Sequence, residues 1–333
     1  MRRLGPVLAL FFLAPLVAEF FLGDFPITLL PLLVVFAPMY GGAAVLIREV
    51  TRRTGRGRAT MLLLALAYGV LEEGLVTQSL FDPNFLNAHL LDDGFVPALG
   101  TAIPWLVFVL SLHTFWSVNV PVAIVEEAVP SRRTTPWLGR GGLTVVSVLF
   151  GLGTVAMFAQ SQQISHGFMA TPAQLGVSAG TVVLLIVAAF LVPSTSAKRA
   201  GTVPNGWVLL GVGIAGGLLF MSGLALPALP GIAAMLLAPA LVGVLVARWA
   251  ARDGWGQWQR LGLTAGTLLT YSWVAFRMHT SSVVIDLISH VLYAVAALAI
   301  LYFTARRIRT AGEASVVPTI DSTDSAQPAL SAA

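Results

Sequence analysis

Apolar runs follow one another along almost the whole chain, separated by short loops. Each run has about 20 residues, the length that an α-helix needs to cross roughly 30 Å of hydrocarbon. Only 10% of the 333 residues are charged, too few to cover a water-soluble globule of this size. The sequence therefore predicts an all-α, polytopic helical membrane protein with ten transmembrane helices. We expect them at residues 4–22, 27–47, 60–80, 101–125, 141–160, 174–192, 207–224, 231–248, 261–279 and 284–303.

The loops on one predicted side of the membrane carry nearly all of the positive charge. They hold 18 of the 19 lysines and arginines, and Arg277 alone lies on the other side. Because basic loops remain in the cytoplasm, we expect both termini to be cytoplasmic. Orientation accounts for these loops, so the expected partner is the lipid bilayer and no nucleic acid. Eighteen arginines against a single lysine are typical of a bacterial protein, and hence of a bacterial plasma membrane.

The predicted helices form one transmembrane domain, residues 1–309, with a possible division into the halves 1–160 and 161–309. Five helices in each half would give the two halves opposite topology, as in several secondary transporters. Residues 310–333 contain little apolar bulk and are expected to form a disordered cytoplasmic tail. The first run also has features of a secretory signal, but its cleavage site is poor, so we expect an anchor helix.

Two adjacent glutamates, Glu72 and Glu73, lie near the midpoint of the third predicted helix. An ionised acid at a helix centre costs roughly 2.5–3.5 kcal/mol, and no predicted span has a central Lys or Arg to offset the pair. His113, near the centre of the fourth predicted helix, is the natural partner. These three residues are therefore the candidate proton relay, general base or cation site. A structural clamp between the two helices is the alternative.

Helical spacing adds polar neighbours to these three residues. It aligns Ser79 with Glu72, for example. The further candidates for a substrate site or gate on these two helices are Tyr68, Gln78, Ser117 and Asn119. Nearer the predicted cytoplasmic boundary, Glu126 and Glu127 precede two arginines and are expected to form solvated ion pairs among the headgroups.

The longest outer loop, residues 81–100, follows directly on the helix of the two glutamates. Its Asp-Pro-Asn turn offers Asp82 and Asn84 to an external vestibule, unless the loop is simply solvated. On the last predicted helix, Asp286 and His290 are four residues apart on one face, where both could bind one cation. Arg277 could instead neutralise Asp286. Whether a metal binds at any of these sites is left open.

A glycine pattern in the seventh predicted helix imitates a dinucleotide site. Gly211-Val-Gly213-Ile-Ala-Gly216 fits the fingerprint but lies inside an apolar run, so we expect close helix packing instead. The chain contains no cysteine, which excludes thiol nucleophiles and Cys-ligated metals. No cofactor is expected.

The Glu72-Glu73 pair, followed on the next helix by an aromatic residue and His113, resembles the CPBP group of intramembrane proteases, which includes the CAAX prenyl endopeptidases. In that family a Glu-Glu-x-x-x-Arg motif and two histidine motifs activate water inside the membrane. The resemblance covers these three residues, while Thr77 stands in place of the arginine. It implies an intramembrane hydrolase. The stretch from Tyr40-Gly-Gly to Phe81-Asp-Pro-Asn is also similar to uncharacterised bacterial multi-pass membrane proteins, a likeness that implies no activity.

Three interpretations of function follow from these residues. A transporter or permease would use Glu72, Glu73 and His113 to couple a proton or cation to the movement of a small solute or ion, and the ten predicted helices favour it. An intramembrane hydrolase would use a glutamate as general base on water, assisted by His113. A membrane scaffold would use the same polar groups only to fix helix packing. The sequence indicates neither a substrate nor an oligomeric state.

Overall fold

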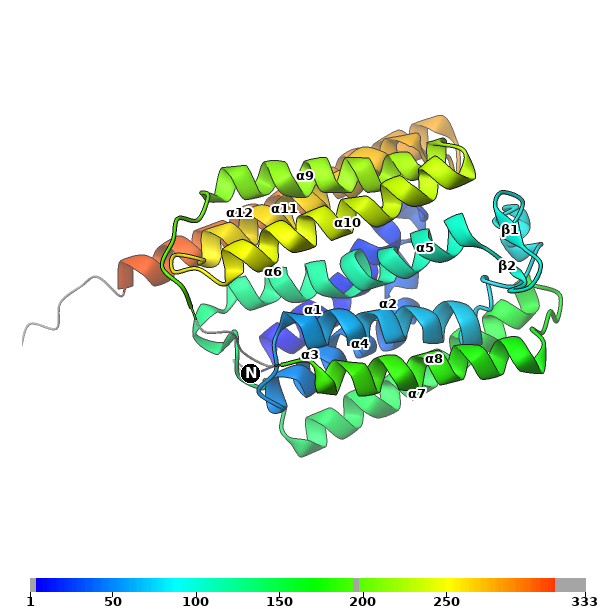
Figure 1. The fold of residues 1–333 in the computed structure, drawn as a ribbon, viewed down its shortest axis with the longest axis horizontal. Helices are drawn as coiled ribbons and strands as arrows, with labels where there is room; N and C mark the ends of the chain where they lie inside the picture. Colours follow the sequence, from blue (N-terminus) through cyan, green and yellow to red (C-terminus); the bar gives the residue numbers. More distant parts are fainter. Residues whose placement is uncertain (1–3, 194–197, 315–333) are drawn as a thin grey trace, which may run out of the picture.

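A computed structural model describes residues 4–193 and 198–314 as a bundle of long, roughly aligned helices (Figure 1). Eight helices of this described part are long and apolar enough to cross a membrane. Two further helices, which begin at Gly5 and Gln257, occupy the remaining predicted spans. The predicted all-α, multi-pass fold is thereby confirmed. The only strands in the described residues form a short hairpin in the loop before α5, where β1 (Phe95–Val96) pairs antiparallel with β2 (Thr101–Ala102).

The helices of the first part of the chain are α1 (Gly5–Pro15), α2 (Leu33–Phe36), α3 (Gly42–Arg53), α4 (Arg58–Leu71), α5 (Ile103–Leu112), α6 (Val120–Ala128) and α7 (Arg140–Ile164). Those of the second part are α8 (Pro172–Leu191), α9 (Gly206–Ser222), α10 (Ala228–Ala250), α11 (Gln257–Val274) and α12 (Val283–Ala314). Turns of π-helix extend or join some of them, at Leu16–Phe20, Ala37–Gly41, Glu72–Val76 and His113–Asn119. Turns of 3₁₀-helix lie at Ile27–Leu32, Phe85–Asn87, Pro130–Arg132, Gly223–Ala225 and Ala275–Arg277.

Local sequence explains where several of these helices begin. The Thr171 hydroxyl accepts a hydrogen bond from the Gln174 backbone N–H at the start of α8, and the Gln174 side-chain carbonyl accepts one from the Thr171 backbone N–H. This capping box satisfies amide groups that have no partner inside the helix. Asn205 caps α9 in the same way, by accepting from the backbone N–H of Val208 at 3.1 Å.

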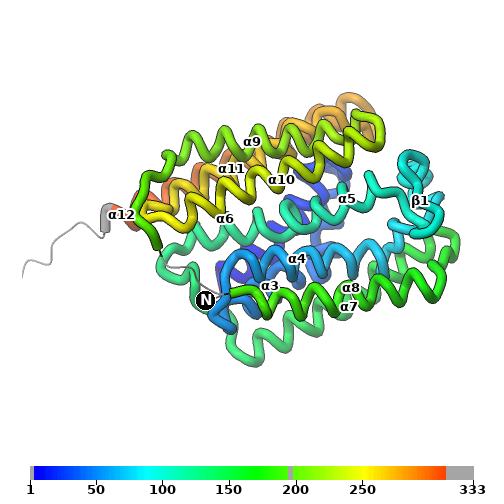
Figure 2. The backbone as a smooth tube through the Cα atoms, viewed as in Figure 1, coloured from blue at the N-terminus to red at the C-terminus, as the bar shows by residue number. Residues whose placement is uncertain are grey.

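The helices form a central group with a layer on either side (Figure 2). The central group consists of α1 to α6, and in its three long spans 56–72% of the apolar window is buried. Helices α7 and α8 pack along α3 and α4 on one side. On the other side α10 packs along α5, α11 and α12 pack along α6, and α9 packs on α10 and α11. In α7, α8, α9, α10 and α12 the buried share is only 11–33%, which leaves most of their apolar surface for lipid.

The packing does not follow the predicted boundary between residues 160 and 161. Helix α8, which would begin the second half, lies against α4 of the central group. The division of the chain into two five-helix halves therefore stays a prediction.

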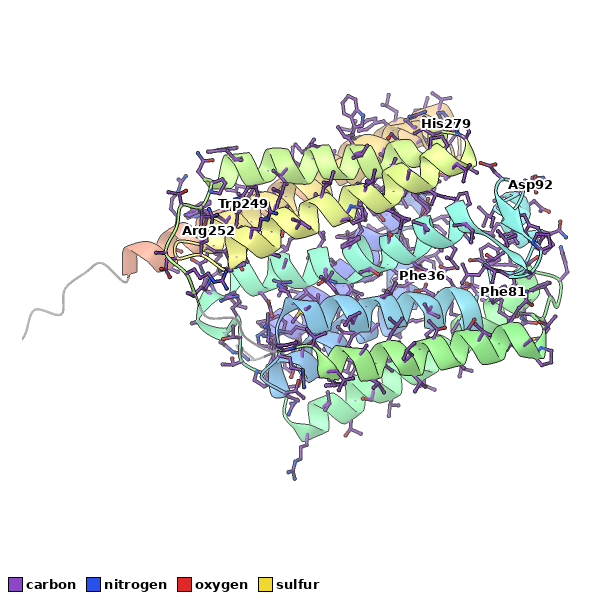
Figure 3. The ribbon with its side chains drawn as sticks, in the orientation of Figure 1. Phe36, Phe81, Asp92, Trp249, Arg252 and His279 are labelled. Carbon is purple, nitrogen blue, oxygen red and sulfur yellow. The ribbon has the colours of Figure 1, made fainter. Side chains whose placement is uncertain are left out.

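The two ends of the bundle differ in chemistry (Figure 3). Arg252 and Trp249 lie at one end, which we call the basic end, and the arginine-rich loops after α3 and α6 lie there too. The loop of residues 81–100, with Phe81 and Asp92, lies at the opposite end together with His279. The basic loops therefore lie together at one end of the bundle, as the distribution of basic residues among the loops of the sequence predicts.

Two expected boundaries are different in the structure. The helix that carries the two glutamates ends at Val76 instead of residue 80, because the chain turns at Gln78, whose φ is +57°. Glu72 and Glu73 therefore lie in its last turn and not at its midpoint. At the other end of the chain, α12 continues to Ala314, so residues 310–314 are helical where a disordered tail was expected. The rest of the predicted tail lies outside the described residues.

Candidate functional site

Each of four helical rods in the central group contains one π-helical turn, and the described residues have no other. A π turn carries one residue more than an α turn and is frequent at functional sites, because it turns side chains out of their α-helical positions. Here the four turns carry the polar residues that meet inside the bundle, namely Glu19, Tyr40, Glu72, Glu73 and His113.

The two glutamates and the histidine form one buried group, which we call the Glu–His cluster (Glu72, Glu73 and His113). His113 Nε2 lies 2.7 Å from Glu73 Oε1, and His113 Nδ1 lies 3.1 Å from Glu72 Oε2. The three residues are 1%, 7% and 5% exposed, respectively. The imidazole ring therefore bridges two carboxylates in surroundings that exclude water, where such contacts are much stronger than at a surface.

The second oxygen of Glu73 accepts further hydrogen bonds. Thr77 Oγ1 donates to Oε2 at 3.0 Å, and the Ser79 hydroxyl donates to the same atom. Trp105 Nε1 in turn donates to Ser79 Oγ at 3.2 Å. The sequence aligned Ser79 with Glu72, but Ser79 follows the end of the helix, so helical spacing does not apply to it.

Aromatic rings enclose the imidazole of His113. The Tyr40 ring stacks on it with centroids 6.0 Å apart, and the Tyr68 ring meets it edge-on at 5.8 Å. Ser117 Oγ lies 3.4 Å from His113 Nδ1. Glu72 Oε2 and the Tyr68 hydroxyl are buried without a partner of hydrogen-bond geometry among the described residues. The Tyr40 and Tyr68 side chains approach the Glu72 carboxylate, so of the two glutamates Glu72 has the looser hydrogen bonding.

The ligand atoms of the Glu–His cluster also suit a metal. One nitrogen of His113 and one oxygen from each glutamate all lie within 4.8 Å of one another. Imidazole nitrogens and carboxylate oxygens are both ligands of zinc, and catalytic zinc sites have three protein ligands. Glu72, Glu73 and His113 are therefore the residues of this chain that could hold such an ion.

Glu19 belongs to the same neighbourhood. Its π turn, Leu16–Phe20, packs against the π turn of His113, and Glu19 interacts electrostatically with His113 and Glu73. Sequence reasoning assigned no role at the cluster to Glu19 or Tyr40. The sequence did contain an indication, because Glu19 is an acid inside a short apolar helix, and burying an acid there is costly unless another polar group pairs with it.

The predicted gate residues after the helix hold the loop in place. Gln78 Oε1 accepts from the backbone N–H of Ala170 at 2.7 Å, which ties the loop to the connection between α7 and α8. Asp82 Oδ1 accepts from the backbone N–H of Asn84 at 2.9 Å and so closes the expected turn. Among the described residues, neither the Gln78 nor the Asp82 side chain hydrogen-bonds to the Glu–His cluster. Asn119 donates to the Thr114 carbonyl at 2.8 Å, on the far side of the His113 turn.

Asp286 and His290 lie apart from the cluster, at the beginning of α12. Asp286 accepts from the backbone N–H groups of Thr280 and Ser281, both at 3.2 Å, which holds the preceding loop against the first turn of α12. No ion pair joins Asp286 to Arg277 in the described structure. His290 packs against the Phe276 ring, with centroids 5.6 Å apart.

A second group of charges lies at the basic end, and we call it the arginine cluster (Arg48, Arg52, Arg53, Arg58 and Arg260 with Glu49, Glu126 and Glu127). Glu126 pairs with three of the arginines, at distances of 2.7–3.2 Å, and Glu127 pairs with Arg260. The expectation of solvated pairs is wrong, because Glu126 and Glu127 are only 0% and 1% exposed. Several helices converge there and exclude water from charges that the sequence placed at a boundary.

Arg48 is the centre of the arginine cluster and is itself fully buried. Its guanidinium lies over the Trp137 ring, 3.5 Å from the centroid, and donates to backbone carbonyls of the loop after α6. Glu49 accepts from the backbone N–H groups of Trp137 and Leu138 at 2.8 and 3.1 Å. This pair therefore fastens α3 to the loop between α6 and α7.

A family model described as an uncharacterized membrane protein family matches residues 8–205. The matched range contains the whole Glu–His cluster and most of the arginine cluster. Comparison with curated proteins and with solved structures finds no match.

Proposed function

The chain belongs to this uncharacterized membrane protein family, and from the Glu–His cluster we propose that it is a transporter that couples a proton or cation to the movement of a small solute or ion. The observation that carries the proposal is the His113 imidazole held between two buried carboxylates. Such groups are expensive inside a membrane, and they occur where a protein binds or moves an ion.

The geometry supports proton exchange at defined atoms. His113 Nδ1 and Glu72 Oε2 are 3.1 Å apart, and a proton transferred from the nitrogen to the oxygen would leave a neutral carboxyl beside a neutral imidazole. Glu73 is held by Thr77 and Ser79 and stays in place as the counter-charge on Nε2. A cation that binds Glu72 would compete with that proton, which is the coupling a secondary transporter requires.

We also propose that the basic end faces the cytoplasm of a bacterial plasma membrane. The loops at this end contain nearly all of the lysines and arginines, and Trp249 lies at the same end, as expected for an aromatic residue at the interface. The Glu–His cluster would then lie nearer to the outer surface, beneath the loop of residues 81–100.

The test uses proteoliposomes on a solid-supported membrane, with charge movement recorded after pH jumps and after addition of solutes from a panel. We expect a pH-dependent signal from the wild-type protein that Glu72→Gln and Glu73→Gln abolish. Asp93→Asn, an exposed acid of the outer loop, is the matched control and should leave the signal intact. Wild-type signals from both glutamate variants would overturn the proposal. If the wild-type protein gives no signal and the two glutamate variants lose thermal stability, the results would favour a membrane scaffold.

The ligand atoms of the cluster favour a second candidate, an intramembrane hydrolase. A bound zinc ion would supply an activated water at neutral pH. Glu72, Glu73 and His113 would hold the ion, and the flanking Tyr68 hydroxyl could donate to a developing oxyanion. We expect one zinc per chain in protein purified with added zinc, and none in His113→Ala, together with metal-dependent cleavage of a fluorogenic membrane peptide. Zinc-free wild-type protein under these conditions would exclude this metal-dependent candidate.

A further inference from the structure

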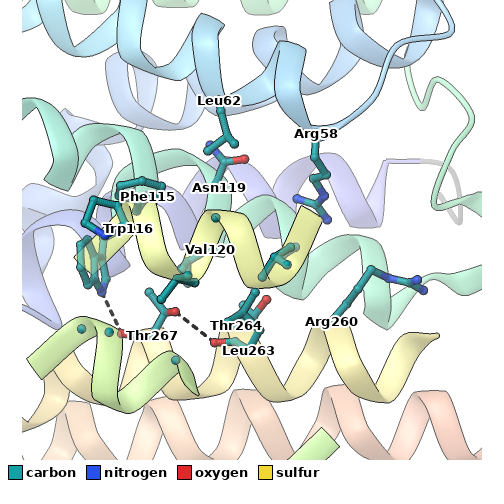
Figure 4. Close-up of a pocket in the computed structure, with 18 of the residues that line it drawn as sticks. Arg58, Leu62, Phe115, Trp116, Asn119, Val120, Arg260, Leu263, Thr264 and Thr267 are labelled. Carbon is teal, nitrogen blue, oxygen red and sulfur yellow. Dashed lines mark hydrogen bonds between the residues drawn. The ribbon is translucent and has the colours of Figure 1, made fainter. Parts of the chain in front are cut away.

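A cavity of about 310 Å³ separates the central group from the outer layer of α9 to α11, and none of the three residues of the Glu–His cluster lines it. Figure 4 shows Arg58 and Arg260 at one end of this cavity and Phe115 and Trp116 at the other. Trp116 Nε1 donates to the Thr267 carbonyl at 2.8 Å, so the indole nitrogen is satisfied and the ring fixes that end. Between the two ends the lining is almost entirely apolar side chains and glycine.

The arginines at the cavity have more donors than the protein uses. Within the part of the chain that the structure describes, Arg58 donates only through Nη2, to Glu126, and Arg260 donates through Nε and Nη2, to Glu127. Each guanidinium has five N–H donors, so both keep donors for another acceptor. Their side chains are 35% and 15% exposed, which makes these donors accessible from the cavity.

The surroundings of the two arginines have an excess of positive charge. In the arginine cluster five arginines pair with three glutamates, so two positive charges are not neutralised within it. Arg58 is the first residue of α4, and Arg260 lies in the first turn of α11, where the helix dipole is itself positive. Cations at helix N-termini are unfavourable unless an anion is near.

We propose that this cavity binds a membrane lipid with an anionic phosphate headgroup. The phosphate would accept hydrogen bonds from Arg58 and Arg260, and the hydrocarbon chain would extend along the apolar lining towards Trp116. A free phosphate would leave most of this lining without a partner, and a zwitterionic lipid would not offset the positive charge. The proposal is independent of the Glu–His cluster and of the transport function.

Native mass spectrometry of the full chain in detergent tests the proposal with phosphatidylglycerol, phosphatidylcholine and inorganic phosphate as separate probes. We expect one phosphatidylglycerol per chain, bound about tenfold more tightly than phosphatidylcholine, and no displacement by phosphate alone. Equal binding of the two lipids would identify a non-specific annular lipid and overturn the proposal. Displacement by phosphate would identify an anion site without a hydrocarbon chain and would also overturn it.

Two pairs of variants separate the headgroup site from the chain site. Arg58→Gln should weaken phosphatidylglycerol binding about tenfold, while Arg53→Gln, an arginine of the same cluster outside the cavity lining, should not. Glu126 keeps two arginine partners in the Arg58 variant, so the fold is expected to survive.

Gly243 lines the cavity, and a Cβ added there would have no atom within 4 Å. The Gly243→Leu variant therefore adds a side chain at the cavity without a clash at its Cβ. It should abolish binding of the lipid. Gly211→Leu meets equally open space outside the lining and should leave binding unchanged. Equal effects of the two variants of either pair would show that the cavity is not the site.

Discussion

Single residues in this protein show how a membrane chain stabilises buried carboxylates. Glu73 accepts from Thr77 and Ser79 and faces His113, while Glu126 has three arginines around it. Both side chains are buried, so each carboxylate needs these partners to offset the loss of water. The first arrangement contains an imidazole, a group that can gain and lose a proton, and the second contains only guanidinium groups, which stay charged. For that reason we place the proposed function at the Glu–His cluster and a structural role at the arginine cluster.

Replacement of Glu126 by alanine should destabilise the protein strongly. Arg48, Arg52 and Arg58 would lose a shared partner in a buried place, and such a loss costs about 3–5 kcal/mol. Thermal unfolding in detergent measures the effect. The exposed pair of His89 and Asp92 provides the control, since Asp92→Asn should change the free energy of unfolding by less than about 1 kcal/mol. Similar effects of the two substitutions would contradict the structural role of Glu126.

The sequence was sufficient to predict the partners of the Glu–His cluster, because two acids in an apolar run have few ways to avoid their desolvation cost. It could not predict that Glu126 is buried. Whether a charge at a helix end meets water depends on which other helices cover it, and α11 brings Arg260 from a distant part of the chain. Ser79 was assigned to the wrong glutamate for a related reason, since the π turn and the early helix end change the geometry locally.

At the scale of elements, the π turn Glu72–Val76 fixes the orientation of the cluster. Deletion of Leu75, a half-buried residue of this turn, should restore α-helix, rotate Thr77 by about 100° away from Glu73 and displace Ser79, which follows it. We expect the pH-dependent charge movement to disappear and the thermal stability to fall by about 1–3 kcal/mol, as for unsatisfied buried groups. Leu75→Ala keeps the chain length and should retain the signal. An undiminished signal after the deletion would mean that the π turn does not position the glutamates.

The packing of α9 against α11 depends on glycines, as the sequence predicted for the false dinucleotide motif. A Cβ at Gly213 would lie 2.5 Å from the Leu263 carbonyl oxygen, and one at Gly266 would collide with that of Leu210. Gly266→Ala should therefore force the helices apart and lower the free energy of unfolding by about 1–3 kcal/mol. Gly211→Ala, in open space on α9, should instead raise it by up to about 1 kcal/mol. Unfolding in mixed detergents compares the two variants, and a stabilised Gly266 variant would contradict this packing.

At the scale of the whole molecule, the sequence predicts the number of helices and their alternating direction within the bundle. It does not predict as well which helices pack against each other. Length and apolar composition decide whether a run crosses the membrane, and both are local properties. The order of packing is not local. Helix α8 lies against α4 and α10 lies against α5, although their apolar surfaces offer no pattern by which a partner could be chosen. Lipid and protein are almost equally apolar, so small residues and a few polar contacts decide which helices meet.

The distribution of arginines among the loops also predicts which end of the molecule faces the cytoplasm. The chain has no cysteine, so single cysteines introduced at exposed positions can report the side of each end of the bundle. In intact bacterial cells, a membrane-impermeant maleimide should label Asp93→Cys, in the loop at the end opposite to the basic end. It should label Asp253→Cys, between α10 and α11 at the basic end, only after the membrane is permeabilised. The reason is that moving the arginine-rich loops across the membrane during insertion is unfavourable. Labelling of Asp253→Cys alone in intact cells would show that the basic end faces outward, and the Glu–His cluster would then lie nearer to the cytoplasm.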